Sequence, residues 1–188
     1  VQTCALPIYY IANTDIDDYH IAFEPHKQQY LSDNDAKLKW VGWSDSQAQT
    51  LVNTINPYKN YCYFIHRYKE HPIYRYKMLG FFYQGNLQLL FVVRKQKMGN
   101  VCCLRIVDLI GSDKHTANLG YEMQKILAEA NAEYIDCWNY GLASSFFDAL
   151  GFYPVSGSTI IPDYFAPFER KNTIIEVDSM NPIPLIVF

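Results

Sequence analysis

The sequence predicts an α/β fold with a mixed sheet, and three observations support this prediction. Residues 74–111 contain three runs of alternating side chains, separated by Gly-Asn pairs at 85–86 and 99–100. A run with helical spacing follows, and then a buried strand at 132–139. Such short turns join antiparallel strands, whereas a strand–helix–strand connection joins parallel ones. We therefore expect an antiparallel meander, then a helix and a parallel strand, with helices flanking the sheet.

Two helices are expected before the meander. Ser44 followed by Gln47 fits a capping box, and Pro57 ends the first helix. The second helix, roughly over residues 58–68, carries its apolar side chains on one stripe. The members of that stripe are Tyr61, Phe64, Ile65 and Tyr68.

A helix and two strands are expected after the parallel strand. Residues 142–152 indicate a short helix closed by Gly151. Residues 154–162 and 172–178 indicate two strands that flank an aromatic turn. The helix between the meander and the parallel strand is supported by Leu119, Met123, Ile126, Leu127 and Ala130.

The composition divides the chain into three segments. Residues 1–8 resemble the translation of a sequencing-adapter read-through, so we interpret them as an artefact and the chain as a metagenomic fragment. Residues 9–43 are polar and weakly periodic, which predicts a linker or the remnant of an upstream domain. Residues 44–188 carry the expected α/β domain.

Charge and cysteine content narrow the function classes. The net charge of -3 argues against DNA as a partner. No apolar run approaches the roughly 20 residues that a membrane span needs. The five cysteines show no metal-binding spacing and suit a reducing compartment, so a cytoplasmic location is expected. One local exception to the acidic balance is the basic stretch 66–77.

Residues 139–152 carry a family resemblance. They resemble the last core helix of the GNAT acyltransferase superfamily, whose pattern is Asn-x-x-Ala-x-x-x-Tyr-x-x-x-Gly-Phe. With one residue inserted after the asparagine, the matching positions are Asn139, Ala143, Phe147, Gly151 and Phe152. Together with the element order, the resemblance covers roughly residues 44–178.

The resemblance implies an acyl donor, acetyl-CoA or a related compound, between the strands at 103–110 and 132–138. The donor's pyrophosphate would lie at the following helix N-terminus, where amides and the helix dipole favour an anion. On this basis Leu109, Ile110 and Gly111 would bind the donor. Asn139 would join them at the end of the next strand, with a helix N-cap as its alternative role.

Two departures from the family pattern affect the expected chemistry. The loop 111–120 lacks the family's paired glycines and carries Asp113 where a phosphate would lie. Phe147 stands where the family often has a tyrosine that protonates the leaving thiolate. The resemblance then leaves Tyr140, or Tyr153, as a replacement acid.

Asp108 is the candidate general base. It lies near the end of the strand expected at 103–110, where such acyltransferases often place a carboxylate near the acceptor amine. Burial would raise its pKa and suit it to proton abstraction. The alternative is that Asp108 pairs with Arg105 or a neighbouring cation, or caps the loop.

Four residues are candidates for binding the acceptor. Asp136 faces away from Ile135 and Cys137 on a buried strand, so it is either structurally paired or contacts the acceptor. His66 and Arg67 suit an anion such as a phosphate or nucleotide sugar, or form a solvated basic face. Tyr164, in the aromatic turn, would stack on a sugar or plug the core.

No metal is expected, because His66 and His71 do not share a helix face and lack a third ligand. The leading prediction is an N-acyltransferase that acts on an amine of a small sugar or amino-acid-derived acceptor. The alternative is a non-catalytic GNAT-like half-domain, because Fem-type envelope enzymes carry two such halves and an upstream half would fit here. A weaker third hypothesis is transfer from aminoacyl-tRNA, which rests on the basic stretch alone.

Overall fold

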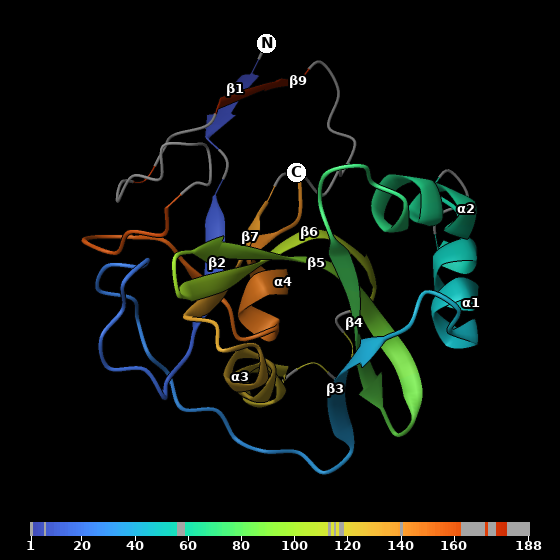
Figure 1. The fold of residues 1–188 in the computed structure, drawn as a ribbon, viewed down its shortest axis with the longest axis horizontal. Coiled ribbons are helices and arrows are strands. Elements are labelled where there is room, and N and C mark those ends of the chain that lie inside the picture. Colours follow the sequence, from blue (N-terminus) through green and yellow to red (C-terminus); the bar gives the residue numbers. More distant parts are fainter. Residues whose placement is uncertain are drawn as a thin grey trace.

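The computed structural model describes residues 2–5, 7–55, 59–112, 114, 116, 119–139, 141–162, 172 and 176–179. A mixed sheet of seven strands, in the order β3-β4-β5-β6-β7-β2-β8, forms its centre (Figure 1). The strands are β2 (Ile8–Ala12), β3 (Ala36–Val41), β4 (Tyr76–Tyr83), β5 (Asn86–Met98), β6 (Val101–Gly111), β7 (Tyr134–Trp138) and β8 (Tyr153–Pro154). The α/β class expected from the sequence is therefore confirmed.

Helices cover both faces of the sheet. The helices are α1 (Ser46–Ile55), α2 (Tyr61–Phe64) with a π-helical turn (Ile65–Lys69), α3 (Leu119–Ala130) and α4 (Ser144–Ala149). Side chains of α3 and α4 join the apolar core on one face, and those of α1, α2 and the π-helical turn join the core on the other. Figure 1 shows α1 and α2 together on one side of the sheet, away from α3.

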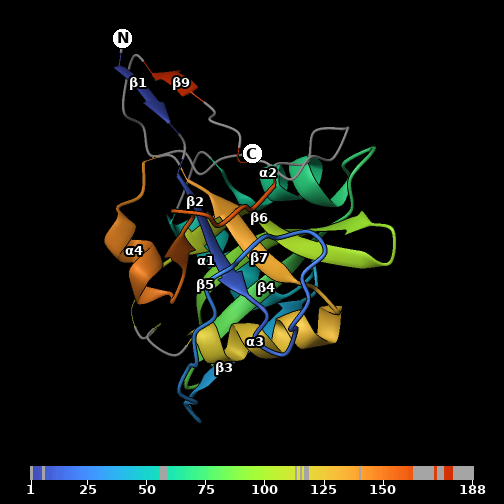
Figure 2. The same cartoon turned by 90° about the vertical axis from the view of Figure 1, so that its left-hand side faces the viewer.

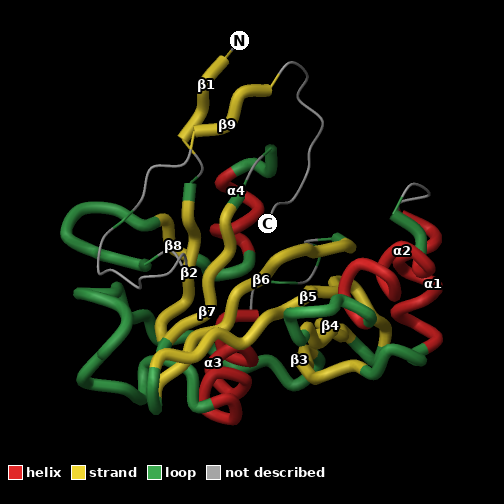
Figure 3. The backbone as a smooth tube through the Cα atoms, turned by 45° about the horizontal axis from the view of Figure 1, so that its top comes forward, coloured by secondary structure: helices red, strands yellow, loops and turns green. Residues whose placement is uncertain are grey.

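The expected meander and its parallel successor are confirmed. Strands β4, β5 and β6 pair antiparallel, and β7 pairs parallel with β6 (Figure 3). Asp136 lies between Ile135 and Cys137, which both join the core under α3, so Asp136 faces the other side as expected. Cys102 and Cys103 also face opposite cores, as the alternation of a strand requires.

Residues 9–43 are not the element-free linker that their polarity suggested. Strand β2 pairs with β7 on one side and with β8 on the other, and its five residues are all buried. Strand β3 pairs with β4 at the sheet edge. A five-residue strand inside a polar segment leaves too little local periodicity to be recognised, because its partner lies far away in the sequence.

The first residues form a separate pairing. Strand β1 (Gln2–Ala5) pairs antiparallel with β9 (Glu176–Ser179). Figures 1 and 2 place this two-stranded sheet at the end of the molecule away from α3. The interpretation of residues 1–8 as an adapter read-through concerns their origin and stays a prediction.

Two local expectations are corrected. Asp45, not Ser44, caps α1, because its carboxylate accepts the amide of Ala48 at 3.0 Å. The strand expected over 154–162 is reduced to β8 and one bridge between Ile160 and Phe23. The strand expected over 172–178 appears as β9, in the smaller sheet. No helix in the described ranges is both long and apolar enough to cross a bilayer.

Candidate functional site

Among the described residues, the carboxyl end of β6 is paired on one side only. β7 pairs with β6 at Leu104, Arg105 and Ile106, and the described register ends there. Residues 107–111 continue along β5 without a described partner on the β7 side. Ligands of α/β sheets bind at the carboxyl ends of strands, so this open edge is the natural candidate site.

A β-bulge directs Asp108 into this site. Val93 pairs with Ile106 and Val92 pairs with Asp108, so Val107 is the extra residue in β6. Val107 therefore lies on the α1–α2 face, next to Asp108 on the same face. Without the bulge, regular alternation would turn the Asp108 side chain toward α3.

Asp108 is almost fully buried, with 1% of its surface exposed, and three donors surround its carboxylate. Its Oδ2 accepts the hydroxyl of Tyr68 at 2.7 Å and lies 3.2 Å from Lys59 Nζ. Its Oδ1 accepts the amide of Leu109 at 3.0 Å. The alternative role of Asp108, pairing with a nearby cation, is thus partly met, and the cation is Lys59 rather than Arg105.

Tyr68 reaches Asp108 from the π-helical turn. Burial, followed by the negative charge of Asp108 and the hydrogen bond to it, raises the pKa of the Tyr68 phenol well above its ordinary value. The phenol therefore stays protonated and remains a donor to the carboxylate. The helical stripe marked Tyr68 as a core residue, but nothing local in the sequence linked it to Asp108.

A second buried acid, Asp136, forms a two-bond ion pair with Arg105. Arg105 Nε donates to Asp136 Oδ1 at 3.1 Å and Arg105 Nη2 donates to Oδ2 at 2.8 Å. Asp136 is 0% exposed, and the guanidinium lies 4.6 Å from the centroid of the Trp138 ring. Of the two roles considered for Asp136, the structure shows the pairing.

Arg94 and two tyrosines form a wall beside Tyr68. Tyr76 lies 5.3 Å from Tyr68, centroid to centroid, and pairs across the strands with Arg94. The Arg94 guanidinium stacks 4.4 Å from the centroid of the Tyr74 ring. Its Nε is buried and finds no acceptor within the described part of the chain. Sequence reasoning missed Arg94, which looked like the polar end of a strand.

Three of the four residues expected to bind the donor lie along the open edge. Leu109 and Ile110 bury their side chains in opposite cores, so only their peptide groups face the edge. Gly111 has φ +137, and a Cβ there would lie 2.2 Å from the Gln88 carbonyl oxygen. Close approach to the β5 backbone therefore explains this glycine.

Asn139 holds its own loop together. Its Oδ1 accepts the amide of Leu142 at 3.1 Å and its Nδ2 donates to the Leu142 carbonyl at 2.8 Å. The N-cap role is wrong, because Ala143 occupies the N-cap of α4. Tyr140 and Tyr164 lie outside the described residues, as does Asp113.

Phe147 is buried and stacks face to face on Tyr9, with ring centroids 4.0 Å apart and an interplanar angle of 7°. Tyr9 thus places a phenol next to Phe147. Burial, and then the charge of Asp148, raises the pKa of that phenol. Because residues 9–43 were interpreted as a linker or a remnant of an upstream domain, Tyr9 was not predicted to contact Phe147.

The basic stretch 66–77 does not form one surface. His66 is exposed and pairs with Glu70 at 2.7 Å, and Arg67 is exposed nearby. Arg75 and Lys77 line a separate pocket under the other face of the sheet. Within the described ranges, no three His, Cys, Asp or Glu side chains gather as a metal site would require.

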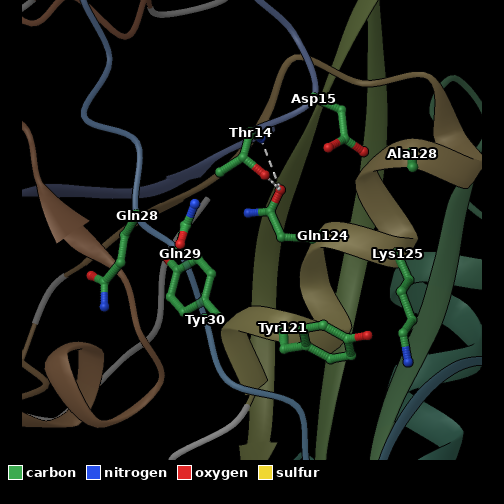
Figure 4. Close-up of a pocket in the computed structure, with 9 residues that line it drawn as sticks. All are labelled: Thr14, Asp15, Gln28, Gln29, Tyr30, Tyr121, Gln124, Lys125 and Ala128. Carbon is green, nitrogen blue, oxygen red and sulfur yellow. Dashed lines mark hydrogen bonds between the residues drawn. The ribbon is translucent and has the colours of Figure 1, made fainter.

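A further pocket of about 400 Å³ lies between α3 and the segment 14–30 (Figure 4). Two of its polar side chains, Gln124 and Tyr30, hold that segment in place. Gln124 Oε1 accepts the amide of Thr14 at 2.9 Å, and Gln124 Nε2 donates to the Ala12 carbonyl at 2.8 Å. Tyr30 donates to the Gly151 carbonyl at 2.8 Å. We interpret this pocket as part of the packing interface between the segment 14–30 and α3.

No protein-family model matches the chain, and no curated protein sequence does. A solved structure that resembles it is that of a functionally unknown conserved protein from Staphylococcus epidermidis ATCC 12228. The two share 12% sequence identity and superpose with a TM-score of 0.48. The match covers 82% of this chain and 59% of the other, so the chain spans little more than half of that protein.

Proposed function

We propose that the chain is a GNAT-like N-acyltransferase that acts on an amine of a sugar or amino-acid-derived acceptor. The observation that carries this proposal is a primary ammonium already placed against a buried carboxylate at the open edge of β6. Lys59 Nζ lies 3.2 Å from Asp108 Oδ2 and belongs to a side chain that is 19% exposed. An acceptor ammonium that displaced Lys59 would meet the same carboxylate.

The reaction would be a direct transfer. Asp108, or a water it orients, takes a proton from the acceptor ammonium, and the neutral nitrogen attacks the donor's thioester carbonyl. The new C–N bond forms as the C–S bond breaks, and the thiolate takes a proton from the Tyr9 phenol or from solvent. The nitrogen releases its second proton to the Tyr9 phenolate or to solvent, which leaves a neutral amide and a free thiol. The unpaired peptide edge at 107–111 supports a role in positioning the donor.

Arg94 bears on the acceptor class. Its buried Nε lacks an acceptor within the described residues and lies in the wall next to Tyr68. A buried donor without an acceptor is costly, so a hydroxyl or carboxylate oxygen on the acceptor would stabilise it. Sugars and amino acids both carry such oxygens next to an amine.

Donor binding is the first test. Acetyl-CoA or CoA at about 100 times its Kd would stabilise the fold by about 2.7 kcal/mol, a rise in Tm of roughly 5–10 °C. Without stabilisation at millimolar concentrations of both, the acetyl-CoA proposal fails.

The acceptor step is tested by CoA release with a panel of amino sugars and amino acids. Asp108→Asn is expected to lower kcat by about 100-fold or more while donor binding stays unchanged. Glu70→Gln, which makes the same charge change at an exposed carboxylate, serves as the matched control. Equal rates in the two variants would remove Asp108 from the mechanism.

The alternative is a non-catalytic GNAT-like half-domain. Phe147 cannot donate a proton, and the Asn139 side chain is used within its own loop, which favour this alternative. It predicts that an amine panel stabilises the protein while acetyl-CoA and CoA do not.

A further inference from the structure

A basic pocket lies at the opposite end of β6 from Asp108, under the other face of the sheet. It has a volume of about 480 Å³, within the size range of small-molecule sites. Four cations line it, namely Arg75, Lys77, Lys95 and Lys97. The site is independent of the proposed acyl transfer.

Strand register explains why the cations gather. Lys77 pairs with Val93, Lys95 with Leu104 and Lys97 with Cys102. The apolar partners all belong to the core under α3, so the three lysines project on that same face. Val93 and Leu104 give the pocket an apolar floor.

The positive charge of the pocket is left unbalanced by the protein. None of the four cations forms an ion pair within the described ranges, although the chain as a whole carries a net charge of -3. Glu129, which is exposed at the end of α3, is the acid among the lining residues. Lys95 Nζ also donates to the Ala130 carbonyl at 2.5 Å. A concave surface lined by one sign of charge attracts the opposite charge.

One wall of the pocket is aromatic. Trp40 is partly buried, and the ammonium of Lys77 lies 5.1 Å from the centroid of its ring. An indole face that attracts a cation also stacks on planar rings. The pocket therefore offers a stacking surface beside a cluster of oxyanion donors.

We propose that this pocket binds a nucleoside diphosphate group. Four cations against one carboxylate suit two adjoining phosphates better than a single carboxylate ligand, because each oxyanion can take a charge-assisted hydrogen bond. The base would stack on Trp40 over the apolar floor. The observations specify a diphosphate next to a planar ring and do not select one base.

Isothermal titration with UDP, pyrophosphate and uridine, at about 50 mM salt, tests the proposal. UDP is expected to bind most tightly, pyrophosphate more weakly and uridine weakest. The Lys77→Gln and Lys97→Gln double variant should weaken UDP binding by about 10-fold or more. Trp40→Leu should weaken UDP by about fivefold and leave pyrophosphate unchanged.

The matched control is the double variant Lys37→Gln and Lys39→Gln. These two exposed lysines lie on β3 and alternate with Leu38, which faces the core under α3, so they project from the opposite face. The control should bind UDP within about twofold of the unaltered protein. Equal weakening in the two double variants, uridine binding as tight as UDP, or no UDP binding at about 1 mM would each overturn the proposal.

Discussion

The two halves of β6 place a buried carboxylate in contrasting surroundings. In the first half, residues 104–106 pair with both β5 and β7, and there Asp136 of β7 lies across from Arg105. Residues 107–111 belong to the half held by β5 alone, and there Asp108 meets Tyr68 and Lys59. Both acids are buried to a similar extent.

The two carboxylates differ in the groups that donate hydrogen bonds to them. Both oxygens of Asp136 accept hydrogen bonds from one guanidinium, and the carboxylate is fully buried. Asp108 is held by a hydroxyl, by an amide of its own strand and by the ammonium of a partly exposed lysine. The two acids are therefore distinguished by the groups that contact them and not by their burial.

The largest expected effect is at Asp136. Asp136→Ala leaves the buried Arg105 guanidinium without its carboxylate, which should lower the free energy of unfolding by about 3–5 kcal/mol. Urea denaturation measures this loss. Replacing the pair together, with Arg105→Met and Asp136→Leu, should recover most of it. A double variant as unstable as Asp136→Ala would contradict the interpretation of this pair as purely structural.

Gly111→Ala tests the close contact between the backbones of β6 and β5 in the open half of β6. The new Cβ would collide with the Gln88 carbonyl in a backbone conformation that favours glycine, so a loss of about 2–4 kcal/mol is expected in urea denaturation. Gly99→Ala is the matched control. Gly99 also has a positive φ, of +59, but has open space around it, so about 1 kcal/mol is expected.

Asp108→Asn should destabilise less than Asp136→Ala. The amide keeps the shape and can still accept from Tyr68, and Lys59 can turn toward solvent, so a loss of about 1–3 kcal/mol is expected. The same urea experiment gives the comparison directly. A loss as large as that of Asp136→Ala would show that the two halves of β6 use their acids alike.

The smallest effect is a pH dependence that comes from Tyr68. Its folded-state pKa is raised above the ordinary value of 10.0, so the native state keeps a proton that the unfolded state loses. Stability is then fully present below pH 10 and falls as pH rises above it, by about 1.4 kcal/mol per pH unit for one proton. Tyr68→Phe should make this decline shallower by that amount. Parallel declines in the two proteins would exclude the coupling.

The sequence predicted the meander and the parallel strand, because their signals are local. The alternation in 74–111 and the Gly-Asn turns can be recognised from neighbouring residues alone. The side of β7 on which Asp136 lies follows from the same local alternation. The bulge at Val107 and the Asp108–Lys59 contact could not be predicted from local patterns. Both depend on register between elements, which one strand's pattern does not contain.

The same limit explains β2. Its five buried residues pair with β7 and β8, and next to them Asn13 Nδ2 bonds to the Ala132 carbonyl across 119 residues. No local pattern within residues 8–12 predicts a central strand. Tyr9 was missed as a neighbour of Phe147 for this reason.

The position of β2 also constrains the order of assembly. During synthesis β2 leaves the ribosome long before β7, its inner neighbour in the sheet. The meander and α3 can fold from local contacts, whereas β2 must wait as an unpaired apolar strand until the chain beyond α3 has emerged. Closure of the sheet by β2 is therefore a late folding step, and during the wait this strand is exposed to pairing with other chains.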